Sequence, residues 1–185
     1  MTNRDHEFSD GAARQALEAL GRLCPPGTNV VLVGGAALIL GYGVARTTHD
    51  IDVLVATPRL AEFGRAIEQV AEQLDLATRW INDGAKAYGE VLPDDFGDRL
   101  TDIGRFGHLS VAAVSRRDLL LLKLHALRPE DLEDVDALEP TPEEIAFVRA
   151  QLPRIARFDP ARAYRTDAYL ASQWPEPPRE ELASQ

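Results

Sequence analysis

The chain has 185 residues, of which 45% are hydrophobic, and its formal net charge is −10. This length and composition support one well-packed core with a small helical addition. The acidic balance argues against a general nucleic-acid-coating surface but leaves room for a local basic patch. Cys24 is the only cysteine, which excludes disulfides and cysteine-based zinc sites within one chain.

The sequence predicts neither a membrane span nor a signal peptide. No apolar run approaches the roughly 20 residues that a helix needs to cross a bilayer. The first residues, MTNRDHEFSDG, lack the apolar core of a signal peptide. We therefore expect a cytoplasmic protein without membrane contact.

The first third of the chain predicts alternating helices and strands. Ser9–Leu23 carries leucines at helical spacing and predicts an amphipathic helix, with Ser9 or Asp10 as its N-cap. The β-branched run Val30–Val33 predicts a short buried strand, Ala36–Leu40 a helix, and Asp50–Val55 a second strand. Thr57-Pro58 predicts the start of another helix, with the threonine as its cap and the proline at its first position.

Paired acids on the second predicted strand indicate a metal site. Because strand side chains alternate between faces, Asp50 and Asp52 should project to the same side while Ile51 turns to the core. Two neighbouring carboxylates repel each other unless a cation lies between them, and Mg²⁺ bound by carboxylates commonly completes its shell with substrate phosphates. Upstream, the Gly34-Gly35 turn would let backbone amides approach an anion at a helix N-terminus. Together these features predict a site for a nucleoside triphosphate and its metal; an exposed strand face and an ordinary tight turn are the alternatives.

From residue 80 onward, the sequence predicts short strands followed by helices. Trp80-Ile81 and Arg99–Ile103 are candidates for short strands, and His108–Val114 for a longer one. Ser115 to Asp118 has the form of a capping box that opens a leucine-rich helix. Three further helices are expected after it, over Glu130–Leu138, after Thr141-Pro142, and over Pro160–Ser172.

The motifs resemble those of a known superfamily. Gly34-Gly35, followed by the run from Arg46 to Asp52 (RTTHDID), is similar to the signature of DNA polymerase β-type nucleotidyltransferases, and more narrowly to the AbiEii-like toxin branch of minimal nucleotidyltransferases. That branch also has a lysine on a later helix, followed by Arg-x-x-Asp-x-x-Asp. The matching residues here are Lys123, Arg128, Asp131 and Asp134. The resemblance extends over residues 30–138.

The resemblance implies an α/β (α+β) fold with a small mixed sheet flanked by helices and a helical carboxy-terminal section. It implies transfer of a nucleoside monophosphate from a nucleoside triphosphate to an acceptor hydroxyl, with Mg²⁺ or Mn²⁺ held by Asp50 and Asp52. Lys123 would hold phosphates. Polymerase-type relatives have a third carboxylate on a later strand, but the strand candidate His108–Val114 contains no acid. Asp131, or failing that Asp134, would therefore complete the set of acids. It also implies a toxin–antitoxin role, with a cognate antitoxin as a partner and tRNA 3′ ends as an acceptor.

Each of these residues also has a simpler interpretation. Lys123 could extend its ammonium from a leucine-rich helix into water, and Asp131 and Asp134 could belong to a solvated acidic helix face. Arg46 could hold phosphate bidentately or lie on the surface. Thr48 precedes Asp50 by two residues, so its hydroxyl would share the metal-facing side if the strand begins that early.

Other functions stay open at this point. An antibiotic-modifying enzyme of the aminoglycoside type or a protein-modifying nucleotidyltransferase would use the same motifs, and a non-catalytic binding module could retain the fold. An RNA acceptor would need a cationic surface, for which the candidates are five arginines against one acid between residues 149 and 165: Arg149, Arg154, Arg157, Arg162 and Arg165. Ordinary solvated helix faces are the alternative.

We expect a core over residues 1–115, a helical section over 116–173 and a mobile tail over 174–185.

Overall fold

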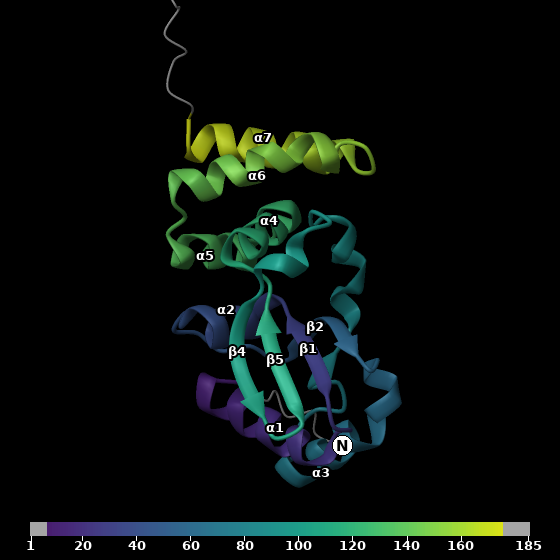
Figure 1. Ribbon diagram of the computed structural model, residues 1–185. Coiled ribbons are helices and arrows are strands. Elements are labelled where there is room, and N and C mark those ends of the chain that lie inside the picture. The colour runs from purple at the N-terminus through teal and green to yellow at the C-terminus, as the bar shows by residue number, and fades with distance from the viewer. Residues whose placement is uncertain (1–6, 176–185) are drawn as a thin grey trace, which may run out of the picture. The chain divides into compact units, whose positions relative to one another are not determined.

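The computed structural model describes residues 7–175 of the chain (Figure 1). The chain divides into two compact units, with the division between Leu119 and Leu120. Among residues 7–175, the first unit contains the sheet and the second contains helices but no strand. Each unit is described by itself below.

The first unit is built on a five-stranded mixed sheet with the order β3-β2-β1-β5-β4 (Figure 1). Its strands are β1 (Thr28–Leu32), β2 (Ile51–Thr57), β3 (Ile81–Asn82), β4 (Thr101–Phe106) and β5 (Leu109–Ala113). The central strand β1 runs antiparallel to β2 and parallel to β5, while β3 adds to β2 in parallel and β4 adds to β5 antiparallel. The predicted fold class, a small mixed sheet flanked by helices with further helices after it, is confirmed.

Three helices of the first unit pack their apolar sides into the core. These are α1 (Asp10–Leu23), α2 (Gly34–Tyr42) and α3 (Gly64–Leu74). Of the two predicted caps of α1, the structure has Ser9, because its hydroxyl accepts a hydrogen bond from the Ala12 N–H, while Asp10 is the first residue of the helix. Five consecutive residues of α2, from Ala36 to Leu40, are buried, which fits a short helix enclosed by protein rather than one with a solvent face.

The predicted helix start at Thr57-Pro58 is wrong. Thr57 is the last residue of β2 and pairs with Asn29 of β1, so it continues the sheet instead of capping a helix. The chain then forms a short 3₁₀ turn, η1 (Leu60–Phe63), capped by Arg59, before α3 begins. The apolar residues at helical spacing in this segment nevertheless face inward: Leu60, Phe63, Ile67 and Val70 are buried, and Leu74 is half-buried.

Between β3 and β4 the chain is irregular, with two 3₁₀ segments, η2 (Gly84–Glu90) and η3 (Phe96–Arg99). After β5, a buried ion pair fixes the start of the next helix, α4 (Arg116–Ala126). The carboxylate of Asp118 is fully buried and accepts two hydrogen bonds of 2.7 Å from Arg99. The Ser115 hydroxyl accepts the Asp118 N–H at 3.3 Å, so the predicted serine cap is present.

The second unit contains the end of α4 together with α5 (Pro129–Leu138), α6 (Pro142–Ile155) and α7 (Pro160–Gln173). The cap-and-proline signals were predictive here, because Thr141 and Asp159 cap α6 and α7 through their side chains. Polar contacts tie α7 to the end of α4: the Thr166 hydroxyl donates to the Leu124 carbonyl at 3.0 Å, and Arg162 donates to the Ala126 carbonyl at 2.6 Å.

The C-cap residue of α7, Trp174, is the first residue of the predicted tail. Trp174 caps α7 through its backbone N–H, its indole ring packs edge-on against Tyr169, and its carbonyl accepts a hydrogen bond from Arg149. Residues 176–185, the rest of that predicted tail, lie outside the described residues. Among residues 7–175, no helix combines the length and the apolar character that a membrane crossing requires.

Candidate active site

The two predicted metal ligands lie at the start of β2, next to the sheet's outermost short strand. Asp50 directly precedes β2 and Asp52 is its second residue; both are half-buried. In the parallel pairing with β3, Ile51 lies opposite Ile81 and Asp52 opposite Asn82. Ile51 is fully buried, as the alternation of strand side chains predicts.

The Gly34-Gly35 pair is required by the approach of β2 and the loop before it to the start of α2. Gly34 has φ +65°, a left-handed conformation that glycine adopts without strain. A Cβ atom on Gly34 would lie 2.7 Å from Asp52 Oδ2, and one on Gly35 would lie 2.6 Å from Thr48 Oγ1. Both distances are too short for non-bonded atoms. The two glycines therefore let the Asp52 carboxylate and the Thr48 hydroxyl pack directly against the N-terminus of α2, where no side chain forms a capping hydrogen bond.

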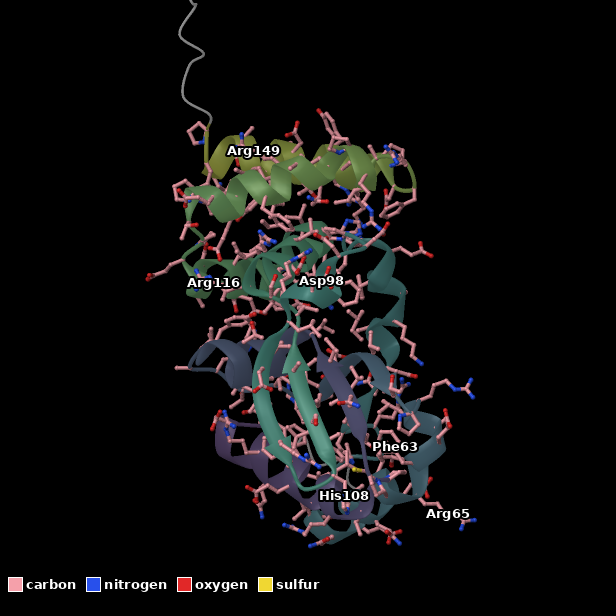
Figure 2. All side chains as sticks on the ribbon, viewed as in Figure 1. Phe63, Arg65, Asp98, His108, Arg116 and Arg149 are labelled. Atoms are coloured by element: carbon pink, nitrogen blue, oxygen red, sulfur yellow. The ribbon has the colours of Figure 1, made fainter. Side chains whose placement is uncertain are left out.

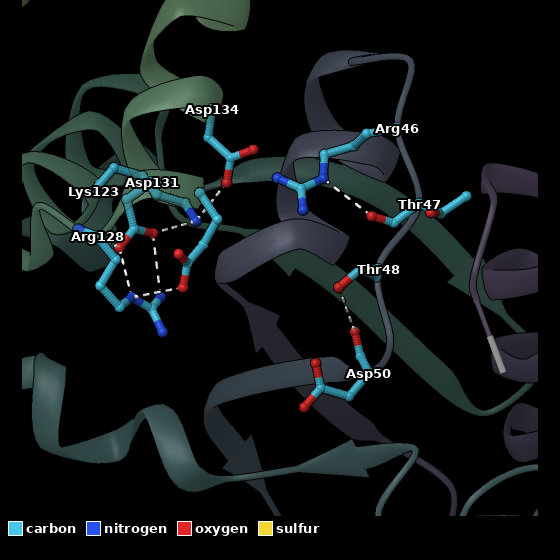
Figure 3. Close-up of polar contacts among 9 residues, drawn as sticks. Arg46, Thr47, Thr48, Asp50, Lys123, Arg128, Asp131 and Asp134 are labelled. Carbon is cyan, nitrogen blue, oxygen red and sulfur yellow. Dashed lines mark hydrogen bonds and ion pairs between the residues drawn. The ribbon is translucent and has the colours of Figure 1, made fainter. Parts of the chain in front are cut away.

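The loop that leads into the acids is fastened at Thr48. Its backbone forms two hydrogen bonds with Phe8, and its hydroxyl donates to the Asp50 carbonyl at 3.3 Å (Figure 3). Arg46 lies earlier in the same loop and donates to the Thr47 carbonyl at 3.1 Å. Thr48 thus fixes the backbone from which Asp50 projects, which is a different role from the predicted metal-facing hydroxyl.

Asn82 is a site residue that the sequence did not reveal. Its Nδ2 donates to Asp50 Oδ2 at 2.9 Å. The apolar pair Trp80-Ile81 predicts a short strand that ends before Asn82. The pairing of β3 with β2 extends this strand by one residue and places Asn82 beside the acids.

The predicted lysine and its two aspartates form a buried ion cluster in the second unit (Figure 3). Lys123 Nζ lies 2.8 Å from Asp131 Oδ1 and 2.6 Å from Asp134 Oδ2. All three residues are buried, so Lys123 does not extend into water and the two aspartates do not form a solvated face. Both simpler interpretations of these residues are therefore wrong.

Arg128 also binds the Asp131 carboxylate. Its Nε donates to Asp131 Oδ2 at 2.7 Å and its Nη2 to Oδ1 at 3.2 Å. Burial disfavours the charged carboxylate, but the hydrogen bonds from Arg128 and Lys123 outweigh it, so the pKa of Asp131 lies below its ordinary value. Asp131 is consequently an ionised carboxylate with cationic partners on both oxygens, which is an unfavourable starting state for a general base.

The five arginines of the proposed RNA surface fall into two groups. Arg149 and Arg162 donate to backbone carbonyls and thereby link helices of the second unit. Arg154 is half-buried, whereas Arg157 and Arg165 are exposed. Two large exposed aromatic side chains occur in the same segment, Phe158 at 45% and Tyr164 at 75% exposure.

The chemistry of the donor set at Asp50 and Asp52 fits a hard divalent cation. Both side chains offer carboxylate oxygens, the ligands that Mg²⁺ and Mn²⁺ prefer. Within residues 7–175, no group of three or more acidic, histidine or cysteine side chains is arranged to hold a metal ion. Two carboxylates can hold such a cation when substrate phosphates and water complete its shell.

A mixed sheet with paired acids at the start of one strand, beside a glycine-opened helix, is suited to binding a nucleotide and its metal ion. A family model described as a nucleotidyltransferase of unknown function (DUF6036) matches residues 15–140. The chain belongs to this nucleotidyltransferase family. The match includes the sheet, the Gly34-Gly35 turn, Asp50, Asp52 and the Lys123 cluster. Comparisons with curated proteins and with solved structures gave no match.

Proposed function

We propose that the protein is a Mg²⁺-dependent nucleotidyltransferase that moves a nucleoside monophosphate from a nucleoside triphosphate to an acceptor hydroxyl. The observation that carries this proposal is the packing of the Asp52 carboxylate against Gly34, without room for a Cβ atom. It brings the carboxylate that would hold the cation next to the helix start that would hold phosphates. Backbone N–H groups and the helix dipole favour an anion at such a position.

The proposed site residues of the first unit would bind the cation and the phosphates. Asp50 and Asp52 would hold the cation, and the backbone amides at Gly34 and Gly35 would hold the β- and γ-phosphates. A bound Mg²⁺ or Mn²⁺ would neutralise phosphate charge and orient the reacting oxygens. The acceptor oxygen forms a bond to the α-phosphorus while the bond from that phosphorus to the bridging oxygen breaks, and pyrophosphate leaves. The acceptor proton passes to a base or to water.

We further propose that the enzyme is the toxin of a toxin–antitoxin system and that its acceptor is the 3′ end of tRNA. The similarity of RTTHDID and of the Lys123 motif to the AbiEii-like branch supports this narrower assignment. The exposure of Arg157, Arg165 and Tyr164 in one segment of an otherwise acidic chain also supports it. Arginine attracts the phosphate backbone, and exposed aromatic rings can stack on unpaired bases.

The direct test supplies the protein with each α-labelled nucleoside triphosphate and Mg²⁺. Total tRNA, cell protein and aminoglycosides are tested as separate acceptors. The proposal predicts label on tRNA, with release of pyrophosphate. Label on protein or on the aminoglycosides would replace the tRNA proposal with one of the other acceptors. No transfer to any fraction, together with no binding of triphosphate, would favour a non-catalytic module.

The contribution of the basic segment can be tested with a charge-matched pair of double variants. Arg157→Glu/Arg165→Glu reverses two exposed arginines of the second unit. Arg22→Glu/Arg65→Glu makes the same change in net charge on α1 and α3 of the first unit, where both arginines are exposed and Arg65 projects from the ribbon (Figure 2).

Only the first double variant should raise the KM for tRNA. It should also flatten the salt dependence of tRNA use, since each lost phosphate contact lowers the slope of log K against log salt by about 0.7–0.9. Equal effects of the two double variants would show that net charge alone matters and would remove this segment as the RNA surface.

A further inference from the structure

Asn82 occupies a position in the sheet from which it can act on both proposed metal ligands. The parallel register places it opposite Asp52 on the neighbouring strand, and paired residues of adjacent strands project to the same face of a sheet. Its side chain then reaches the other acid, because Nδ2 lies 2.9 Å from Asp50 Oδ2. One neutral residue is thus paired with Asp52 in the sheet and hydrogen-bonded to Asp50.

The orientation of the Asn82 amide is fixed from its other end. Its Oδ1 accepts the backbone N–H of Gly84 at 2.9 Å. A Cβ atom on Gly84 would itself lie 2.9 Å from this oxygen, so the glycine allows the turn to fold back onto the amide. Because Oδ1 faces a donor, the NH₂ group must face Asp50, and the amide oxygen is turned away from the acids.

We propose that Asn82 is a positioning residue of the nucleotidyl-transfer site. It holds the Asp50 carboxylate by hydrogen-bond donation, and it keeps the charge of the metal site at two carboxylates. This inference rests on the proposed function, because it assigns a role to Asn82 at the site where Asp50 and Asp52 hold the cation. It differs from the predicted roles of Asp131 and Asp134, since it describes a site with a neutral donor where a third acid could stand.

The substitution Asn82→Asp isolates the proposed role. Aspartate has nearly the same size and can still accept the Gly84 N–H, but it offers no donor to Asp50 and adds a negative charge. Without a cation, three carboxylates would repel one another. With a cation, the new carboxylate provides another oxygen ligand. The proposed role therefore predicts a gain in metal affinity, which loss of packing alone would not produce.

The experiment measures Mn²⁺ binding to the free full-length protein by the electron paramagnetic resonance signal of unbound Mn²⁺. Wild type is compared with Asn82→Asp, Asn82→Ala and the control Asn29→Asp, which adds the same charge at an exposed position on β1 of the same sheet. Asn82→Asp should bind Mn²⁺ about tenfold more tightly than wild type and Asn29→Asp. Asn82→Ala should bind it about tenfold more weakly, the range expected when the partner of a ligand is removed.

Thermal unfolding provides a second measurement on the same proteins. Asn82→Asp should melt below Asn29→Asp without metal and recover with saturating Mn²⁺. Equal Mn²⁺ affinities in wild type and both Asn82 variants would overturn the positioning role while leaving the metal site intact. Absence of Mn²⁺ binding in wild type, with and without triphosphate, would instead overturn the metal site of the proposed function and this inference with it.

Discussion

Alanine substitutions at two glycines with the same backbone conformation can distinguish an effect on catalysis from an effect on stability. Gly34 and Gly43 stand at opposite ends of α2 with φ +65° and +66°. A Cβ atom on Gly43 would meet no atom within 4 Å, whereas one on Gly34 would lie 2.7 Å from Asp52 Oδ2. Alanine at either position introduces the same left-handed strain. Only alanine at Gly34 also displaces the proposed metal ligand.

The expected magnitudes follow from these contacts. Left-handed strain costs roughly 1–2 kcal/mol for a residue with a Cβ atom, so Gly43→Ala should lose about this much free energy of unfolding. In Gly34→Ala the Asp52 carboxylate must also retreat by roughly 0.5–0.8 Å to reach the ~3.5 Å separation of non-bonded atoms. A misplacement of about 1 Å can reduce catalysis about 100-fold. We therefore expect Gly34→Ala to lose 10- to 100-fold in kcat/KM and Gly43→Ala less than about threefold.

The assay combines urea unfolding with steady-state transfer of labelled nucleotide, measured well below the melting temperature of each variant. Gly41→Ala, in the same helix as Gly34, serves as a further control, because its Cβ atom would lie at an ordinary 3.4 Å from the Cβ atom of Ala113 in β5. Similar kcat/KM values for Gly34→Ala and Gly43→Ala would refute the reasoning, since the close approach of Asp52 to Gly34 would then have no catalytic consequence.

Three further predictions concern buried and paired charges. Lys123→Ala leaves Asp131 and Asp134 buried without their ammonium partner, so urea unfolding should show a loss of about 3–5 kcal/mol; near-wild-type stability would contradict the buried cluster. The pKa of Asp131 is lower in the folded protein, so its contribution is complete above its unfolded pKa of about 4 and is lost as pH falls through the lower folded value. Asp131→Asn should therefore show a shallower loss of stability than wild type as the pH falls below about 4, and parallel curves would contradict this. Arg99→Met leaves the fully buried Asp118 carboxylate without its bidentate partner and should cost about 3 kcal/mol in the same assay, whereas an unchanged midpoint would contradict that pairing.

Features with a local physical cause were predictable from the sequence. The caps at Ser9, Thr141 and Asp159 depend on a side chain and a backbone N–H three residues away, and their sequence signals were sufficient. The strand at Asp50–Val55 and the glycine pair before α2 were also recognised, because hydrophobic alternation and a Gly-Gly turn are local patterns. Thr57 was misassigned because its cap-and-proline signal competed with pairing to Asn29 across the sheet, and the tertiary pairing decided the structure.

Features that depend on contacts distant in sequence were not predictable in this way. Asn82 reaches Asp50 across 32 residues, and no periodicity of its own short strand indicates that contact. The burial of Lys123 depends on the following helix, which brings Asp131 and Asp134 to its ammonium. Its role as a phosphate ligand stays a prediction, and a triphosphate would have to compete with two carboxylates for it.

The central claim is that Asp52 helps to hold the metal ion on which nucleotidyl transfer depends. The most direct measurement is the Mg²⁺-dependent incorporation of α-labelled nucleotide by wild type, Asp52→Asn and Asp102→Asn. Asp102 is an exposed acid on β4, three strands away from β2 in the same sheet, so it controls for loss of a carboxylate. Incorporation should fall to background in Asp52→Asn and persist in Asp102→Asn. Transfer by Asp52→Asn at the wild-type rate and with the wild-type Mg²⁺ dependence would contradict the claim.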